Sequence, residues 1–348
     1  MIKVYGVIGD TPALNLILNH KSHVGYSCCW YCHIIGTHIG GKRQYYYDEN
    51  VSLRSAADFE ADSRRAESLG KSVNGRHGTS ILKKVVDIPL PDSIVADYLH
   101  TTLLGHAKAV CVYLYKQYMR PQERIHFNKK IRAQRFPHFF NRKIRTFEEP
   151  YLKATEIRNM FLFCILPMIR EILHVDLVAH LALFVLGIRK RLHLMELNNK
   201  SSCAKLLHGR PEFGNRTADI ANKLLTIYYR DHETFYVGLQ NFVLHIHSHF
   251  ADLYKKHGSL CNINTFSQED LMGVVSKLKH GANHWADQLV FYLNIDFALN
   301  NEVNHTEPTV LIRTPKGVFD NTLMPNELCQ VVSSFTPENA FSHVYIHI

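Results

Sequence analysis

The sequence has no hydrophobic run long enough to cross a bilayer. Its main apolar stretches, 160–169 and 177–188, are bounded or interrupted by charged residues and histidine, and both are shorter than the roughly 18 residues that a spanning helix needs. We also find no secretory signal peptide, internal repeat or low-complexity tract. We therefore expect a non-secreted globular chain in a reducing compartment, where cysteines bind metals rather than pair as disulfides.

Acidic residues are too few to balance the basic ones. The 348-residue chain has 31 Asp and Glu against 40 Lys and Arg, which gives a net charge of +9. This balance favours an anionic partner, of which nucleic acid is the commonest. The length is sufficient for two or more packed units.

The N-terminal region predicts a strand that ends in a carboxylate. The apolar run 4–8 is followed by Gly9-Asp10-Thr11-Pro12-Ala13. Enzymes that cut DNA with two metal ions need carboxylates that converge from different strands and helices. Asp10 before Thr11-Pro12 is also typical of a helix N-cap. The residues alone leave both interpretations open.

A Cys-x-x-Cys pair, Cys29 and Cys32, follows in a polar, glycine-rich stretch. Two thiolates at this spacing can share one tetrahedral zinc. Cys28 and His33 flank the pair, and three reduced thiols in a loop are the alternative. The sequence has no obvious second pair of ligands. We expect one remote histidine, His100, and weaker candidates are His33, His77 and His106.

A histidine pair occurs much later in the chain. His245 and His249 are four residues apart, on one face of a predicted helix. A metalloprotease helix would carry Glu directly after the first of them, and Ile246 stands there. We therefore exclude that class of enzyme.

Residues 120–145 form a basic segment in which phenylalanines alternate with cations. Such a segment can hold phosphates while its aromatic side chains anchor it to the core. A solvated basic surface is the alternative. The candidate phosphate-binding residues are Arg120, Arg124, Lys129, Lys130, Arg132, Arg135, Arg142, Lys143 and Arg145.

Two further motifs are weak when taken singly. Asp97-Tyr98-Leu99-His100 precedes Leu103-Leu104-Gly105, and a helical histidine of this kind is most often a core residue. Glu269 opens a predicted helix, where the helix dipole favours an acid without any catalytic role.

Taken in order, these motifs resemble the transposases of CACTA (EnSpm-like) DNA transposons, particularly the animal type. That family carries Gly/Asn-Asp-x-Pro-Ala, Gly-x-x-x-Cys-x-x-Cys, Gly-x-x-Gly-x-Ser-x-Leu, Asp-x-Met/Leu-His-x-x-Leu-Leu-Gly, Lys-Ala-x-Glu-x-Arg-x-x-Leu, and a late Glu-x-x-x-Gly followed by His-Gly. Counterparts occur here in the same order at 9–13, 25–32, 75–82, 97–105, 153–158, and 269–273 with 280–281.

The resemblance implies a DDE transposase with a ribonuclease-H-like core, which cuts DNA and joins strands using Mg²⁺ or Mn²⁺. Asp10 would be the second aspartate and Glu269 the glutamate of the triad. Cys29, Cys32 and His100 would hold a structural Zn²⁺. The family's first aspartate lies upstream of the Asp10 block, and Gln268 replaces a common aromatic residue. We therefore expect the C-terminal portion of the catalytic region, inactive alone, with strand 3–8 at an exposed sheet edge.

The expected fold is an α/β core fragment, an incomplete ribonuclease-H-like fold, with a large, mostly α-helical insertion and a zinc-knuckle-like loop region. Its parts would be a strand–helix element of the core at 1–25, a Cys/His insert at 26–105, a helical insertion at 106–265, a core helix at 266–300, and a tail of unknown role at 301–348. Helices are predicted near 12–18, 94–116, 152–174, 176–196, 215–256 with a break, and 268–298. Strands are predicted at 309–313 and 344–348.

The expected function is that of a fragment or domesticated derivative of a DDE transposase acting on DNA. The alternative is a non-catalytic DNA- or protein-binding protein derived from a transposase. By the resemblance the chain would be nuclear, otherwise cytoplasmic, with DNA as partner and no membrane association. The sequence leaves a homo-oligomer open.

Overall fold

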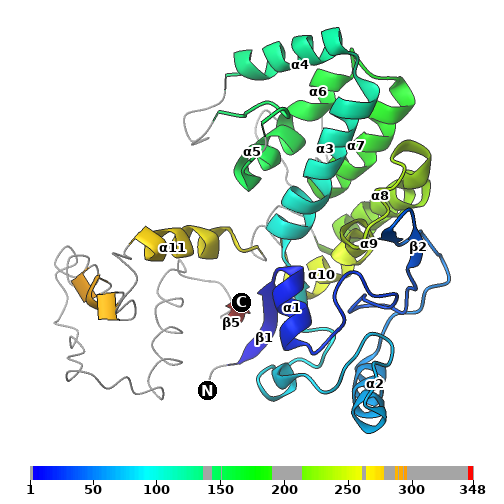
Figure 1. Ribbon diagram of the computed structural model, residues 1–348, viewed down its shortest axis with the longest axis vertical. Helices are drawn as coiled ribbons and strands as arrows, with labels where there is room; N and C mark the ends of the chain where they lie inside the picture. The colour runs from blue at the N-terminus through cyan, green and yellow to red at the C-terminus, as the bar shows by residue number, and fades with distance from the viewer. Residues whose placement is uncertain are drawn as a thin grey trace. The chain divides into compact units, whose positions relative to one another are not determined.

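The computed structural model (Figure 1) describes residues 3–135, 143–149, 151–189, 214–260, 264–277, 287–288, 290–292, 294–295 and 344–347. The chain divides into two compact units, one formed by Met1–Thr265 with Val344–Ile348 and the other by Phe266–His343. The described fold is mixed α/β, mostly helical, with a small sheet.

The sheet in the first unit has three parallel strands in the order β4-β1-β5. β1 (Val4–Gly9) pairs with β4 (Ile94–Ala96) so that Gly9 lies opposite Ala96, and with β5 (Val344–His347) on its other side. Residues 6–9 of β1 and all of β4 are buried. Such continuous apolar strands are typical of parallel sheets covered on both faces.

Two expectations about this sheet need correction. Strand 3–8 was expected at an exposed edge, but β5 pairs with β1 and makes it the central strand. Residues 94–96 were expected to begin a helix, and instead they form β4. The predicted strand near 344–348 is confirmed as β5, whereas the one at 309–313 lies outside the described residues. Three parallel strands fit many α/β folds, and a ribonuclease-H-like core stays an expectation.

The region 21–93, expected to be irregular, contains a hairpin, a helix and a short 3-10 helix. β2 (Thr37–Ile39) and β3 (Lys42–Gln44) form an antiparallel hairpin, turned by Gly40 and Gly41, both with positive φ. α2 (Ala56–Leu69) begins at a capping box formed by Ser55 and Asp58. A short 3-10 helix, η1 (Ile81–Lys84), follows.

The remaining elements are helices. Residues 99–118 combine η2 (Leu99–Ala107), α3 (Lys108–Tyr113) and η3 (Leu114–Tyr118), with π-helical turns, and α1 (Thr11–Ile17) follows β1 near the N-terminus. The others are α4 (Pro121–Ala133), α5 (Ala154–Asn159), η4 (Met160–Cys164), α6 (Ile165–Ile169), α7 (Val175–Arg189), α8 (Gly214–Phe235), α9 (Phe242–Ile246), η6 (His247–His249), α10 (Phe250–His257) and, in the second unit, α11 (Phe266–Lys277).

Helices α7 and α8 lie side by side (Figure 1) and bury apolar faces against each other. Gly187 permits their close approach, because a Cβ at this position would lie 2.8 Å from Cδ2 of Leu225. None of the helices in the described part of the chain combines the length and apolar character that crossing a membrane requires.

Candidate metal centre

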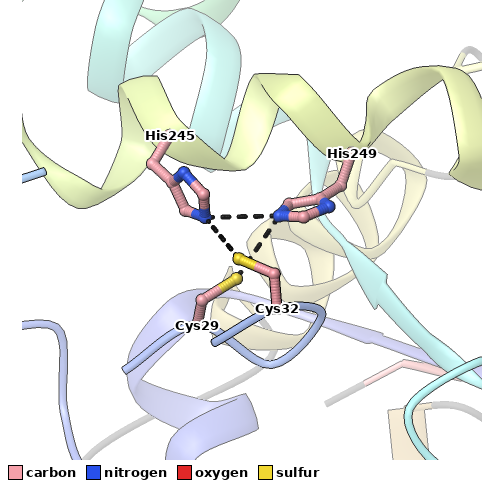
Figure 2. A group of neighbouring side chains, drawn as sticks. All are labelled: Cys29, Cys32, His245 and His249. Carbon is pink, nitrogen blue, oxygen red and sulfur yellow. Dashed lines mark hydrogen bonds between the residues drawn. The ribbon is translucent and has the colours of Figure 1, made fainter. Parts of the chain in front are cut away.

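Four buried side chains, Cys29, Cys32, His245 and His249, converge at one point (Figure 2). Their sulfur and ring nitrogen atoms all lie within 4.8 Å of one another. Nε2 of His245 is 3.2 Å from Sγ of Cys32 and 3.2 Å from Nε2 of His249. Nε2 of His249 is 3.4 Å from Sγ of Cys29. None of the four side chains belongs to a residue more than 5% exposed.

This arrangement fits a tetrahedral metal ion. Zinc bound at about 2.3 Å from sulfur and about 2.0–2.1 Å from nitrogen separates neighbouring ligand atoms by roughly 3.3–3.8 Å. The observed separations of 3.2–3.4 Å agree with that geometry to a few tenths of an ångström. Two thiols and two imidazoles are also the donor set that such sites use. The cluster can therefore hold a structural metal such as zinc.

The ligands come from two distant segments. Cys29 and Cys32 lie in the loop between α1 and β2, while His245 and His249 lie on α9 and η6, which run on into α10. The two segments are separated by more than 200 residues, since the Cys29–His249 contact spans 220 positions. A metal here would cross-link the cysteine loop to the helical part of the first unit.

The orientation of His245 is set by a hydroxyl. The Tyr229 hydroxyl donates to the backbone carbonyl of Tyr45 at 2.7 Å, so its oxygen is left to accept from Nδ1 of His245, 3.4 Å away. With its proton on Nδ1, the ring presents the lone pair of Nε2 to the cluster. Burial lowers the pKa of His245 and keeps it neutral, the state that binds a metal.

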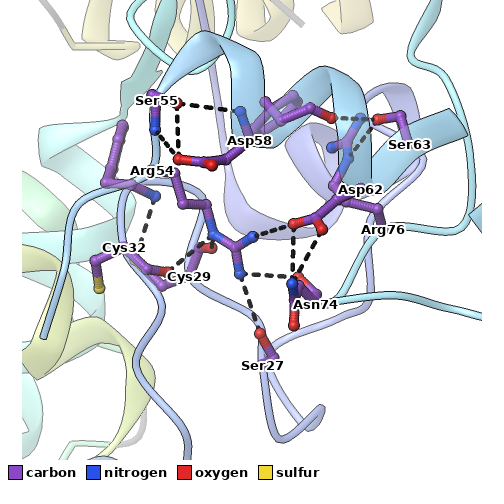
Figure 3. A network of polar contacts seen from close by, with 12 residues as sticks. Ser27, Cys29, Cys32, Arg54, Ser55, Asp58, Asp62, Ser63, Asn74 and Arg76 are labelled. Atoms are coloured by element: carbon purple, nitrogen blue, oxygen red, sulfur yellow. Dashed lines mark hydrogen bonds and ion pairs between the residues drawn. The ribbon is translucent and has the colours of Figure 1, made fainter. Parts of the chain in front are cut away.

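A buried arginine, Arg54, holds the cysteine loop through hydrogen bonds (Figure 3). Nε of Arg54 donates to the carbonyls of Cys29 and Cys32 at 3.1 and 2.9 Å. The two terminal nitrogens bind Asp62 at 3.2 Å, and Ser27 and the Asn74 carbonyl at 3.0 and 2.8 Å. The loop therefore has a fixed shape in which both sulfurs face the histidines.

Hydrogen bonding also prepares one thiol for coordination. Burial alone would raise the pKa of Cys29, but its pKa lies below the usual value because the Cys32 side chain and the amides of Tyr31 and Cys32 donate to its sulfur. The neighbouring Cys28 is not part of the cluster. Its sulfur lies 2.7 Å from the Tyr45 hydroxyl, and burial raises its pKa.

The ligand set differs from the one expected. His100 lies outside the cluster, because its Nδ1 is 2.6 Å from Oδ2 of Asp97. The weaker candidates are also elsewhere: His77 is exposed, His33 is half-buried, and Nε2 of His106 is 2.9 Å from the Tyr228 hydroxyl. His245 and His249 replace them. The His-x-x-x-His spacing was a usable signal, since Cys-x-x-Cys with a remote histidine pair is a common zinc-binding pattern.

Asp10 lies after β1, at the N-terminus of α1. It is the N-cap of that helix, and its Oδ1 accepts from the amide of Ala13 at 2.8 Å. The capping interpretation of this residue is thus confirmed. Glu269 lies in the first turn of α11, which belongs to the other compact unit.

A second carboxylate follows β4, the strand that neighbours β1. Asp97 is fully buried, and the register that pairs Gly9 with Ala96 places Asp10 and Asp97 at the same edge of the sheet. Asp97 accepts hydrogen bonds from the amides of Leu99, His100 and Thr265, and from the side chains of His100 and Thr265. Its oxygens are therefore fully used inside the protein.

Four cations of the basic segment are engaged within the fold. Arg120 pairs with Glu123 at 2.6 Å, Lys130 with Glu171 at 2.5 Å, and Arg145 with Glu156 at 2.7 Å, whereas Arg124 donates to the carbonyls of Met119 and Lys116 at 3.0 and 2.6 Å. Arg142 lies outside the described residues.

Four other cations of this segment are exposed. Within the described part of the chain their side chains make no ion pair or hydrogen bond. They are Lys129, Arg132, Arg135 and Lys143.

Comparisons with known proteins identify no relative: no family model, no curated protein and no solved structure matches the chain.

Proposed function

We propose that this chain is a zinc-stabilised DNA-binding protein of the CACTA-transposase kind that does not itself cut DNA. The observation that carries the proposal is the Cys29–Cys32–His245–His249 cluster. It joins the Cys-x-x-Cys segment, one of the motifs on which the family resemblance rests, to the helical part of the same unit.

A structural role for zinc is supported by the closed ligand set. Catalytic zinc sites keep a position open for water or substrate, whereas structural sites use four protein ligands. Here four buried protein ligands converge. The zinc would contribute folding energy by holding the cysteine loop against α9 and η6.

DNA binding is supported by the exposed cations of α4 and the residues after it. Phe127 and Ile131 anchor the buried face of α4, while Lys129, Arg132 and Arg135 are exposed without a protein partner in the described residues. A cation without an internal partner can neutralise a DNA phosphate and release its counterion. The net charge of +9 favours the same partner.

The proposal that the chain does not cut DNA is supported by the hydrogen bonds that Asp97 makes within the fold. Cutting by the family's Mg²⁺ or Mn²⁺ chemistry needs several carboxylates around the metal pair. The neighbouring carboxylate at the sheet edge that carries Asp10 is Asp97. Its oxygens already accept five hydrogen bonds inside the protein and are therefore not available to a metal ion. The resemblance assigns Asp10 and Glu269 as metal carboxylates of this chain, and two carboxylates hold a pair of metal ions poorly.

The test is DNA binding as a function of salt. The triple variant Lys129→Ala/Arg132→Ala/Arg135→Ala should bind a short duplex more weakly. Its slope of log K against log salt, between about 50 and 200 mM, should be reduced by up to about three, because each lost phosphate contact removes about 0.9 from the slope. Fluorescence anisotropy with the zinc-loaded chain measures both quantities.

A charge-matched control separates contact from net charge. Arg65, Lys71 and Lys84 are exposed residues of the insert, and their replacement by alanine removes the same charge. This control should keep most of the wild-type slope. Equal slopes for both triple variants and the wild-type chain would contradict the proposal and favour the protein-binding alternative.

Incubation of the chain with supercoiled DNA and Mg²⁺ or Mn²⁺ tests whether the chain cuts DNA. We expect no nicking by the wild-type chain. Nicking that Asp10→Ala abolishes would instead favour the catalytic alternative. The family resemblance implies a nuclear location, and microscopy of the tagged chain would test this implication.

A further inference from the structure

A second buried arginine of the insert, Arg76, lacks a counter-ion. Its Nε donates to Oγ of Ser63 at 3.2 Å, one terminal nitrogen donates to the Gly78 carbonyl at 3.3 Å, and its guanidinium lies 3.8 Å from the ring centroid of Phe59. The other terminal nitrogen, Nη1, is buried and has no hydrogen-bond partner. No ion pair in the described residues involves Arg76.

Arg54, the other buried arginine of this insert, has a full set of hydrogen-bond partners, in contrast to Arg76. Arg54 makes five hydrogen bonds, one of them to the carboxylate of Asp62. Figure 3 shows both arginines beside α2, with Asp62 directed to Arg54. The Asp62 carboxylate also attracts Arg76 electrostatically, but its ion pair is with Arg54. A buried charge without a directly paired counter-ion is destabilising, and an anion in contact with the guanidinium would supply that counter-ion.

A pocket of about 200 Å³ borders Arg76. It lies between α2 and the segment 79–90 and has an apolar part that includes Phe59, Val86 and Leu90. The polar part of its lining comprises Glu60, Ser63, Arg76, Thr79, Ser80 and Lys83.

The charged residues that line this pocket are two cations, Arg76 and Lys83, and one acid, Glu60. Glu60 pairs with Lys83 at 2.7 Å and also lies 3.6 Å from Arg64, outside the lining, so the buried charge of Arg76 is the one left without a paired acid in the lining. Burial lowers the pKa of Arg76 to about 10, which leaves the guanidinium protonated at neutral pH.

We propose that this pocket binds a small oxyanion, a phosphate or carboxylate group. Arg76 is the buried cation that meets the oxygen atoms, and Lys83 is the exposed cation at the pocket's rim. The apolar lining accommodates a short carbon substituent on the anion. This site is separate from the metal centre and from the exposed cations of α4, and it stands whether or not the chain binds DNA.

The experiment measures thermal stability of the full zinc-loaded chain in sodium phosphate or sodium acetate, with ionic strength held constant by sodium chloride. Saturable binding to the folded state should raise Tm by roughly 3–6 °C for each tenfold increase in anion above its dissociation constant. The arm that responds, phosphate or acetate, identifies the group. A Tm that follows ionic strength alone in both arms overturns the proposal.

Three variants localise the effect. Arg76→Met should abolish the anion-dependent rise, and Lys83→Met should raise the apparent dissociation constant by about tenfold. Lys84→Met, one residue along the chain and exposed, should leave the response unchanged. If Arg76→Met does not fold, as judged by circular dichroism and zinc content, Lys83→Met decides alone. An undiminished response in Lys83→Met places the anion elsewhere and overturns the assignment.

The test of the anion pocket is independent of the test of DNA binding. The alanine triple variant of α4 should keep its anion-dependent rise in Tm. Loss of the response in that variant, with Lys83→Met unaffected, would show that the anion binds the basic segment and would also overturn the pocket.

Discussion

Acidification should unfold this protein through histidines that are buried away from the metal centre. His106, His180 and His232 lie on η2, α7 and α8 and are almost fully buried. Each has a ring nitrogen without a hydrogen-bond partner in the described residues: Nδ1 of His106, Nδ1 of His180 and Nε2 of His232. Their neighbours are mostly aromatic, including Tyr228 and Tyr236.

Burial lowers the pKa of all three, to about 4 for His180 and well below the usual value for His106 and His232. The hydrogen bond to the Tyr228 carbonyl and the charge of Asp231 oppose this lowering of the His180 pKa without cancelling it. The folded state therefore keeps these rings neutral. The unfolded chain, in which the histidine pKa is about 6.5, takes up the protons first.

The direction follows from this difference in proton binding. The contribution to stability is fully present above about pH 6.5 and is lost as the pH falls toward the folded-state values. Each proton contributes about 1.4 kcal/mol per pH unit, so three histidines give a slope of about 4 kcal/mol per pH unit near pH 5. That loss is large beside the roughly 5–15 kcal/mol that stabilises an ordinary domain.

Urea unfolding followed by circular dichroism, at pH steps from about 7 to 5 with zinc present, measures this slope. His180→Gln removes one of the titrating rings and should reduce the slope by about 1.4 kcal/mol per pH unit. His174→Gln is the control, because that side chain is 76% exposed. Equal slopes in His180→Gln and the wild-type chain would refute the reasoning.

Three further outcomes follow from the structure. Cys29→Ser should reduce the metal content, measured by mass spectrometry, from about one ion per chain to near zero, whereas Cys111→Ser, a buried cysteine outside the cluster, should retain it. Tyr229→Phe removes the acceptor for Nδ1 of His245 and should weaken metal affinity, measured by chelator competition, by about 10–100-fold. Asp97→Asn should destabilise the first unit by about 2–4 kcal/mol in urea unfolding, because amide nitrogen cannot accept the hydrogen bonds that the carboxylate accepts; unchanged stability would contradict the structural role assigned to it.

Local chemistry made some elements predictable. The buried strand at 4–8 and the helix cap at Asp10 could both be predicted from the sequence. Each is determined by residues that are adjacent along the chain. The helices near 152–174 and 215–256 followed from apolar spacing and recur as 154–169, 214–235 and 242–257. α2 was missed although Ser55-x-x-Asp58 is a legible capping box.

Long-range partners were harder to predict, although the spacing of His245 and His249 was a usable signal. Nothing in the spacing of Cys29 and Cys32 indicates which of 23 histidines completes the site, because that depends on how segments 220 positions apart pack. We predicted His100 as a ligand because of its motif. In the structure its ring nitrogen Nδ1 instead hydrogen-bonds the buried carboxylate of Asp97. Similarly, β5 is a recognisable strand, but its place beside β1 is set by tertiary pairing.

The long separation of the two ligand pairs determines how strongly a metal can stabilise the fold. A metal stabilises only by the difference between its affinity for the folded and the unfolded chain. In the unfolded chain Cys29-x-x-Cys32 is still a two-thiol ligand, but joining it to His245 and His249 would close a loop of 220 positions, at an entropic cost that increases with loop length. The unfolded chain therefore offers at most half of the site. The folded chain offers all four ligands on a cysteine loop already shaped by Arg54. Most of the metal's affinity should then appear as folding stability, so that the loss of either pair has nearly the same effect as removal of the metal itself.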